Sequence, residues 1–317
     1  MKPLKIVFFG TPDFAAHTLK AIHESQHEVV GVVTVADKAS GRGQKINESP
    51  VKKYAVSENL PIFQPEKLRN PEFLQQMKDL DADLFVVVAF RMMPKILFEL
   101  PKMGTFNLHA SLLPDYRGAA PINYAIINGE TITGATTFFI NEKIDEGNIL
   151  LQEEIPVGEN ENAGSLHDRL MEMGGGLIVK TLNGLSEGNI KEIPQPHREI
   201  PKNAFKIFKE DTRINWNQSS KKIHDFVRGM SPYPCAFTTL QIGEESKGLK
   251  IFAGKYEILV HSNPIGTLDI SKSECKIYTE DGIFYPLEVQ LEGKKRMTVK
   301  DFLNGFHSYD QIKKSVI

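Results

Sequence analysis

Cysteine and tryptophan are scarce in this chain of 317 residues, which has two cysteines and one tryptophan. Neither Cys235 nor Cys275 belongs to a paired motif. The sequence therefore predicts neither a disulfide framework nor a zinc site, and it is typical of a reducing compartment. We expect each cysteine to act as a small buried hydrophobic residue.

Long apolar runs are absent as well. None approaches the roughly 20 residues that a membrane helix needs. Residues 1–5 lack the apolar stretch and the cleavage site of a signal peptide. We therefore expect a cytoplasmic protein with no membrane partner.

The glycine motifs that bind nucleotide cofactors are incomplete or missing. Gly10-Thr11-Pro12 follows an apolar run, but it lacks the further glycines of a dinucleotide fingerprint. The sequence contains no Walker-type loop. We expect no nicotinamide or flavin cofactor and no metal.

The formal net charge is only −2, but it is unevenly distributed. Residues 1–200 carry 20 basic and 26 acidic side chains, whereas residues 201–317 carry 18 and 14. A basic C-terminal part suggests a polyanionic partner. So modest an excess favours the other interpretation, a solvated surface without a partner, so charge alone does not establish a polyanionic partner.

The first two hundred residues alternate strand-like and helix-like segments. Residues 84–89 are apolar on both faces, which is typical of a central parallel strand. Strands separated by helices indicate βαβ units, so we expect a Rossmann-like, doubly wound, mostly parallel α/β sheet in a domain of residues 1–192. The other strands are expected at 6–9, 29–35, 105–108 and 136–140, and the helices at 13–24, 51–57, 71–80, from 94, and at 122–128.

Three glycines, Gly174 to Gly176, interrupt a long helical pattern over residues 165–182. Residues 193–206 hold three prolines among charged residues, which predicts a linker. Residues 207–317 then carry one helix and several short, closely spaced strands, so we expect a small antiparallel barrel or sandwich. These strands are expected at 236–242, 249–256, 266–270, 275–279 and 283–291.

A polar pair ends the strand expected at residues 105–108. Reactive groups of doubly wound sheets lie beyond the carboxyl ends of strands, and Asn107 and His109, two apart, point to the same side. Asn offers a donor to an oxyanion and His exchanges a proton near neutral pH. Asp145, in a turn after the next strand, could orient the histidine. Strand-end and turn residues of these types are also commonly structural, so spacing alone does not decide.

A longer ordered pattern surrounds the pair. Asn107-x-His109 is followed by Ser111-Leu112-Leu113-Pro114, by Arg117-Gly118 and Pro121, by the run 133–136, and by Asp145-x-Gly147. This pattern resembles the signature of 10-formyltetrahydrofolate-dependent formyltransferases and hydrolases. The resemblance implies that Asn107, His109 and Asp145 are catalytic. It also implies that Ser111, Leu112, Leu113 and Pro114 contact the folate co-substrate, with Val88 and Ala89 lining the pterin site.

Within this family, three features resemble the methionyl-tRNA formyltransferases. Residues 37–52 form a long basic loop similar to the one those enzymes place against the tRNA acceptor end, with Arg42 at the key position and Lys38 and Lys45 beside it. A disordered surface loop is the alternative. The C-terminal strands resemble that family's OB-like tRNA-binding barrel, in which Lys294, Lys295 and Arg296 would contact phosphate or be merely solvated. The resemblance runs from Lys5 to about Lys314 and implies a monomer whose acceptor is initiator methionyl-tRNA.

The chain departs from the family pattern in three places. Val35-Ala36-Asp37-Lys38 stands where Gln-Pro-Asp-Arg is usual, Phe90-Arg91 where Tyr-Gly is usual, and Asp115-Tyr116-Arg117 where Arg-Trp-Arg is usual. Two other functions stay open at this point. One is formyl transfer to an amino sugar or a nucleotide amine. The other is a catalytically silent nucleic-acid-binding protein, which would have no need of the three catalytic residues.

Overall fold

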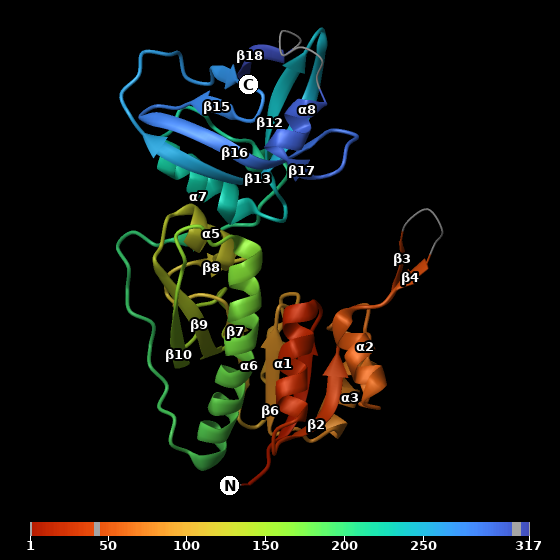
Figure 1. Cartoon of the computed structure of the whole chain (residues 1–317). Helices are drawn as coiled ribbons and strands as arrows, with labels where there is room; N and C mark the ends of the chain where they lie inside the picture. The colour runs from red at the N-terminus through yellow and green to blue at the C-terminus, as the bar shows by residue number, and fades with distance from the viewer. Residues whose placement is uncertain (1, 41–44, 306–311, 317) are drawn as a thin grey trace. The chain divides into compact units, whose positions relative to one another are not determined.

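The computed structural model describes residues 2–40, 45–305 and 312–316 (Figure 1). The chain divides into two compact units that are not continuous in sequence. The first unit comprises Met1–Gly118, Thr133–Pro156 and Asp168–Asn203, and the second comprises Ala119–Ile132, Val157–His167 and Ala204–Ile317. The short strands β8 (Arg117–Gly118) and β11 (Asn203–Ala204) lie where the chain passes from one unit to the other.

A seven-stranded sheet forms the centre of the first unit, in the order β10-β9-β7-β6-β1-β2-β5. The neighbouring pairs β5-β2, β2-β1, β1-β6 and β6-β7 are all parallel, and β9 runs antiparallel to β7. The expected doubly wound, mostly parallel sheet is confirmed. The strands are β1 (Lys5–Gly10), β2 (Glu28–Val33), β5 (Ile62–Phe63), β6 (Leu84–Val88), β7 (Thr105–His109), β9 (Ile132–Phe139) and β10 (Ile149–Pro156).

Strand β1 pairs with β2 on one side and with β6 on the other, so the winding direction of the sheet reverses between β1 and β6. Every residue of β6 is buried, as its uniformly apolar sequence predicts for a central strand. The carboxyl ends of β6 and β7 lie beside each other, with Val88 opposite Leu108. In such sheets this edge is where ligands bind.

Capping residues and prolines in the sequence explain where two helices of the first unit begin. Ser49 and Asn70 cap α2 (Pro50–Ser57) and α3 (Pro71–Asp79), where each side-chain oxygen accepts a hydrogen bond from a backbone N–H of the first turn. Proline occupies the first helical position of both, where its missing N–H costs nothing. The other helices are α1 (Asp13–His23), α4 (Lys95–Phe98) and α6 (Ala163–Glu187), whose residues from Asp168 on belong to this unit.

The expected interruption at Gly174–Gly176 is wrong, because α6 is a single continuous helix of 25 residues. The glycines instead allow close packing. A Cβ on Gly174 would come within 2.9 Å of Leu108 Cδ2, and one on Gly175 within 3.3 Å of Ala21 Cβ. Tertiary packing thus outweighs the roughly 1 kcal/mol per residue by which glycine disfavours a helix.

The second unit contains one antiparallel sheet in the order β14-β15-β16-β13-β12-β18, with β17 paired to β16. The order closes on itself, because the N–H of Val316 in β18 donates to the carbonyl of Gly266, just before β14, at 3.0 Å. The structure is therefore the expected OB-like barrel and not a sandwich. Its strands are β12 (Ala236–Ile242), β13 (Glu245–Ile258), β14 (Leu268–Ile270), β15 (Cys275–Tyr278), β16 (Gly282–Leu291), β17 (Met297–Thr298) and β18 (Ile312–Val316).

The described residues of the second unit also form α5 (Pro121–Ile127), α7 (Ser220–Met230), α8 (Val299–Asn304) and a short 3-10 turn (Glu210–Thr212), and they include the first residues of α6. Trp216 lies in the barrel core, where its indole N–H donates to Thr238 Oγ1 at 3.0 Å and its ring packs on Phe284. Both cysteines are free and buried, as expected, and burial raises the pKa of Cys235 to about 11 and that of Cys275 to about 12.

The helices of residues 2–40, 45–305 and 312–316 include none that is both long and apolar enough to cross a membrane.

Candidate active site

Strand β7 places Asn107 and His109 on the same face of the sheet, at its carboxyl end. The backbone of Asn107 lies opposite Val87 of β6 and Phe138 of β9. His109 is buried, and its ring packs edge-on against Phe138 at a centroid distance of 6.5 Å. Both sequence-predicted groups therefore reach the edge of the sheet where ligands are expected.

A backbone carbonyl fixes the ring of His109. Its Nε2 lies 2.8 Å from the carbonyl oxygen of Tyr116, a residue with a left-handed backbone (φ +62°). A carbonyl can only accept, so Nε2 carries the proton. In the neutral ring Nδ1 is then the unprotonated nitrogen.

Asp145 lies on the Nδ1 side of His109. Its Oδ2 is 3.8 Å from Nδ1, and the same oxygen accepts a hydrogen bond from the N–H of Gly118 at 2.9 Å. The turn that carries Asp145 is tight. Asp145 has φ +53°, and a Cβ on Gly147 would lie 1.5 Å from the carbonyl oxygen of Phe139, so only glycine fits there.

The side-chain oxygen of Asn107 is buried and has no hydrogen-bond partner within the described part of the chain. Buried polar atoms are nearly always paired, so an orphaned oxygen on the strand face that also carries His109 is a candidate acceptor for a ligand. Of the three residues expected to be catalytic, Asn107 and His109 thus share one face of β7, and Asp145 approaches His109.

The expected folate-contacting turn follows β7 directly. Ser111, Leu113 and Pro114 are buried and Leu112 is half-buried. The Ser111 hydroxyl donates to the carbonyl of Asp115 at 2.6 Å, so it is already engaged. What this turn offers a ligand is mainly its backbone and Leu112.

Two side chains that the sequence did not single out hold this turn. The hydroxyl of Thr136 in β9 donates to the carbonyl of Ser111 at 2.6 Å and accepts from the N–H of Leu113 at 3.1 Å. Gln152 in β10 donates to the carbonyl of Leu113 and to Thr136 Oγ1, both at 2.9 Å. Thr136 belongs to the matched run of residues 133–136, but the sequence assigned it no role. Gln152 belongs to no motif.

The end of β6 lies beside the end of β7, which leads into this turn. Val88 is buried, whereas Ala89 is exposed and has a left-handed backbone (φ +46°). The following departure from the family pattern has a structural role, since the Arg91 guanidinium donates to the carbonyls of Pro65 and Glu66. In the same way, Arg198 pairs with Asp115 at 3.3 Å.

The expected tRNA-binding loop is described only in part. Arg42 lies outside the described residues. Lys38 and Lys45 begin the paired strands β3 (Lys38–Ser40) and β4 (Lys45–Asn47), which extend away from α2 (Figure 1).

The base of this loop is anchored by Lys52, the third residue of α2. Its ammonium group pairs with Asp37 and, at 2.9 Å, with Glu48, and so ties the two ends of the loop together. The hydrogen bond from Lys52 lowers the pKa of Asp37.

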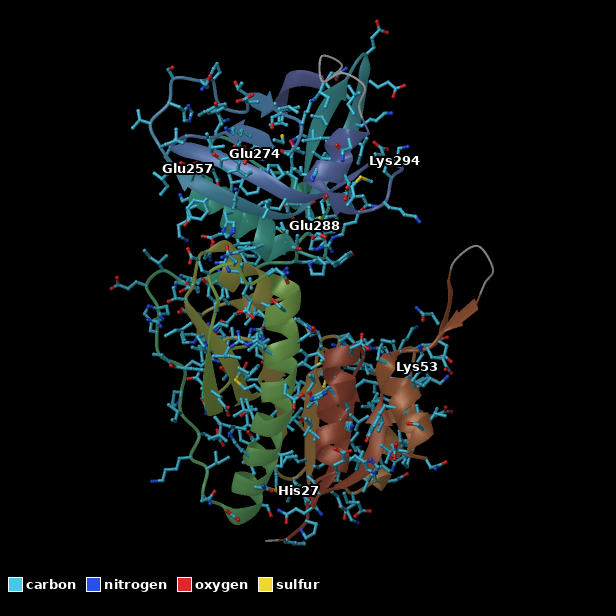
Figure 2. The ribbon with its side chains drawn as sticks, viewed as in Figure 1. His27, Lys53, Glu257, Glu274, Glu288 and Lys294 are labelled. Atoms are coloured by element: carbon cyan, nitrogen blue, oxygen red, sulfur yellow. The ribbon has the colours of Figure 1, made fainter. Side chains whose placement is uncertain are left out.

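The three C-terminal basic residues differ from one another. Lys294 and Lys295 are exposed, whereas Arg296 pairs with Glu288 and stacks over the Phe252 ring at 4.3 Å. Figure 2 shows Lys294 on the opposite side of the barrel unit from Glu257. Two of the three cations are therefore available to a polyanion, and the third is partly neutralised.

Comparison with known protein families gives two matches. The formyl transferase family matches residues 4–182, and the formyl transferase C-terminal domain matches residues 206–307. The first match alone spans more than half of the chain.

Curated relatives match over nearly the whole length. The methionyl-tRNA formyltransferase of Flavobacterium johnsoniae is 48% identical over 313 residues, which cover 99% of each chain. The methionyl-tRNA formyltransferase of Bacteroides fragilis is 46% identical over 319 residues, which cover 99% of this chain and 98% of the relative.

Solved structures share the fold at lower identity. An N-formyltransferase from Helicobacter canadensis, solved with folinic acid and dTDP-3-aminofucose, is 21% identical with a TM-score of 0.65, covering 89% of this chain and 98% of that one. The sugar 3N-formyltransferase WlaRD, solved with dTDP and 5-N-formyltetrahydrofolate, is 22% identical with a TM-score of 0.63, covering 93% and 100%. The full-length matches decide the assignment: this chain belongs to the formyl transferase family and, within it, to the methionyl-tRNA formyltransferases.

Proposed function

We propose that this protein transfers the formyl group of 10-formyltetrahydrofolate to the α-amino group of methionine on initiator tRNA, in the cytoplasm and as a monomer. The observation that carries the proposal is identity of 46–48% over nearly the whole chain to methionyl-tRNA formyltransferases. The convergence of Asn107, His109 and Asp145 at one end of the sheet supports the same chemistry.

The reaction begins when the amino nitrogen attacks the formyl carbon. A C–N bond forms and the formyl oxygen becomes an oxyanion. The amide N–H of Asn107 would donate to this oxyanion, while its buried and unpartnered Oδ1 would accept a hydrogen bond from the bound reactants. A donor of this kind is worth about 10²–10³ in rate.

His109 would take the proton that the nitrogen loses, directly or through a water molecule. Its Nε2 is committed to the carbonyl of Tyr116, so Nδ1 is the nitrogen that accepts. The protonated ring then stands 3.8 Å from the Asp145 carboxylate, which stabilises the new positive charge. The intermediate collapses as the bond between the formyl carbon and folate N10 breaks. N10 takes up the proton that His109 carries, which restores the neutral ring, and the products are formyl-methionyl-tRNA and tetrahydrofolate.

Folate would bind along the turn Ser111–Pro114 and the end of β6 at Val88 and Ala89. The tRNA would contact the basic loop through Arg42, Lys38 and Lys45, and the barrel through Lys294, Lys295 and Arg296. Phosphate contacts of this kind position a nucleic acid and make its binding dependent on salt.

One assay tests the proposal. The protein is incubated with 10-formyltetrahydrofolate and methionyl initiator tRNA, and in parallel with an amino-sugar nucleotide, because related folds are solved with such ligands. We expect formyl-methionine in the first reaction and no formylated sugar in the second. The reverse result would overturn the choice of acceptor.

A further inference from the structure

Gln195 makes four hydrogen bonds around the turn that carries Asp145. Its Nε2 donates to the carbonyl oxygens of Asp145 and Gly147, both at 2.8 Å. Its Oε1 accepts from Arg117 Nε at 3.0 Å and from Arg117 Nη2 at 2.6 Å. The residue lies in the proline-rich segment expected to be a linker, where nothing in the sequence suggested a part in the active site.

The orientation of this carboxamide is unambiguous. Backbone carbonyls can only accept and a guanidinium can only donate, so the nitrogen must face the turn and the oxygen must face Arg117. Both N–H groups and both acceptor positions of Gln195 are occupied. No bonding capacity is left for a substrate, so any role in the reaction is exerted through its neighbours.

The segment before Gln195 is held in register with the strand after the turn. Ile193 and Ile149 exchange two backbone hydrogen bonds of 2.8 and 2.9 Å. Beside them, Asn148 Nδ2 donates to Glu192 Oε2 at 2.9 Å. This pairing brings Gln195 alongside the turn.

Gln195 links the two backbone segments that position the Asp145 carboxylate. One is the turn itself, where Asp145 has a left-handed backbone conformation (φ +53°) that residues other than glycine rarely adopt. The other is Arg117, whose neighbour Gly118 donates its N–H to Asp145 Oδ2 at 2.9 Å. Gln195 thus hydrogen-bonds both the turn that carries the carboxylate and the side chain of Arg117. It acts beside a weaker direct link, the ion pair of Arg117 Nη1 with Glu146 Oε1 of the same turn at 3.4 Å.

We propose that Gln195 is a positioning residue for formyl transfer: it clamps the Asp145 turn to Arg117 and so sets the place of the Asp145 carboxylate beside His109. The kinetic part of this inference rests on the proposed function. The structural part, that Gln195 holds Asp145 against Gly118, does not.

The structural part is tested by the amide proton of Gly118. The chain contains three Arg-Gly pairs, at Arg42, Arg117 and Arg228. Labelling with carbonyl-¹³C arginine and ¹⁵N glycine therefore leaves three correlated signals to assign. We expect Gln195→Leu in the full-length protein to move the Gly118 amide proton toward its position in Asp145→Asn, because the charge-assisted bond to the carboxylate is lost or lengthened. A Gly118 signal that stays at the wild-type position would overturn the proposal.

The kinetic part is tested by a double-mutant cycle. A displacement of about 1 Å can cost about 10²-fold in rate, so Gln195→Leu should lower kcat about 10²-fold with the KM of both substrates nearly unchanged. If Gln195 acts through Asp145, Gln195→Leu/Asp145→Asn should be no slower than Asp145→Asn alone. Losses that multiply would mean that Gln195 acts by another route, and would overturn the proposal.

Two variants guard against a general loss of fold. Gln195→Glu keeps the acceptor for Arg117 but faces two carbonyls with oxygen, so we expect it to be as slow as Gln195→Leu; full activity would overturn the clamp. Gln75→Leu makes the same change on the exposed face of α3, where the carboxamide donates to Asp79, and should leave kcat and the Gly118 signal unchanged. If the wild type makes no formyl-methionyl-tRNA, the proposed function fails, and the Gly118 signal still decides the role of Gln195.

Discussion

The imidazole of His109 and the carboxylate of Asp145 stand 3.8 Å apart, Nδ1 to Oδ2, while the hydrogen bond of the ring is made on its other side, to the carbonyl of Tyr116. That distance is too long for a hydrogen bond but short enough for charge stabilisation. The orientation of the ring therefore comes from the backbone. The carboxylate acts mainly when Nδ1 gains a proton.

Removing the Asn107 amide should slow catalysis without weakening binding. We expect Asn107→Ala to lower kcat about 10²–10³-fold, because a donor to the developing oxyanion is lost. Dissociation constants for tRNA and folate, measured by equilibrium binding, should change little. A variant with near-wild-type kcat would show that Asn107 is not the oxyanion donor.

The brace on the turn Ser111–Pro114 should control folate affinity. Thr136→Val removes the hydroxyl that bonds Ser111 and Leu113 but keeps the shape of the side chain. We expect a raised KM for 10-formyltetrahydrofolate and an almost unchanged KM for tRNA, measured by steady-state kinetics.

Thr137→Val is the matched control, because Thr137 is equally buried on the opposite face of β9 and bonds Thr181 at 2.9 Å. Both variants lose buried hydrogen bonds and should be destabilised by about 1–3 kcal/mol. Equal effects of the two on folate KM would contradict a specific role for Thr136.

Apolar periodicity is a local feature and predicted the parallel sheet, but it left the C-terminal strands open between a barrel and a sandwich. The resemblance to formyltransferases predicted the OB-like barrel. The catalytic role of Asn107, His109 and Asp145 also comes from that resemblance and stays a prediction.

The sequence did not predict β10, in which Ile149 and Leu150 are buried and the consecutive polar residues Gln152, Glu153 and Glu154 follow, nor the continuity of α6 through Gly174. Those outcomes depend on long-range packing. Tyr116 was missed for another reason: it acts through its carbonyl, which every residue possesses.

The roles of Gln195 and Gln152 could not be predicted from the sequence either. Each is a neutral side chain in a segment without a motif, and each matters only because the fold brings distant carbonyls within its reach. The departures at Arg91 and Asp115 can be explained only afterwards, from their contacts with Glu66 and Arg198.

Arg42 should affect tRNA use alone. We expect Arg42→Ala to raise the KM for methionyl-tRNA, to reduce the steepness of its salt dependence by about one phosphate contact, and to leave the KM for folate unchanged. Kinetics at several salt concentrations measure this. Arg69→Ala, which removes an exposed arginine next to α3, is the control and should change neither KM. An equal loss of folate binding in Arg42→Ala would argue against the loop assignment.

His27 should make the first unit sensitive to mild acid. It is buried near the start of the chain (Figure 2), where Nδ1 accepts from the N–H of Leu4 at 3.2 Å and Nε2 lies 3.0 Å from Asn183 Oδ1. Burial lowers the pKa of His27 below its ordinary value of 6.5. The unfolded chain therefore binds a proton first as pH falls, and the contribution of His27 to the free energy of unfolding is complete above pH 6.5 and lost progressively below it.

Urea unfolding curves collected between about pH 8 and about pH 5.5 measure this slope. His27→Asn offers Leu4 an acceptor that does not titrate. At the upper end of this range the variant should have a lower free energy of unfolding than the wild type. That free energy should change less with pH in the variant, so the difference in stability between the two proteins should narrow in acid. Parallel curves would show that His27 does not contribute to the pH dependence.

The ion pair of Asp225 and Arg228 should stabilise the second unit more than an exposed surface ion pair would. Both side chains are buried on α7, where Asp225 accepts from Arg228 Nε at 2.8 Å and from Lys221 Nζ at 2.6 Å. Burial raises the pKa of Asp225, but the hydrogen bonds from its partners lower it further, to about 2. The pair therefore stabilises the fold above pH 3.8, and this contribution is lost as pH falls from 3.8 toward 2.

Asp225→Asn keeps the size of the side chain but leaves Arg228 buried without a counter-charge. We expect a loss of about 3–5 kcal/mol in the free energy of unfolding, measured by urea titration. Asp225→Leu/Arg228→Met removes both charges and should cost less than Asp225→Asn alone, because no buried charge is left unpaired. Part of the loss should remain in the double variant, since Arg228 also donates to the carbonyl of Glu161 at 2.9 Å. A double variant less stable than Asp225→Asn would show that this bond to Glu161, and not the ion pair, is the main stabilising contact.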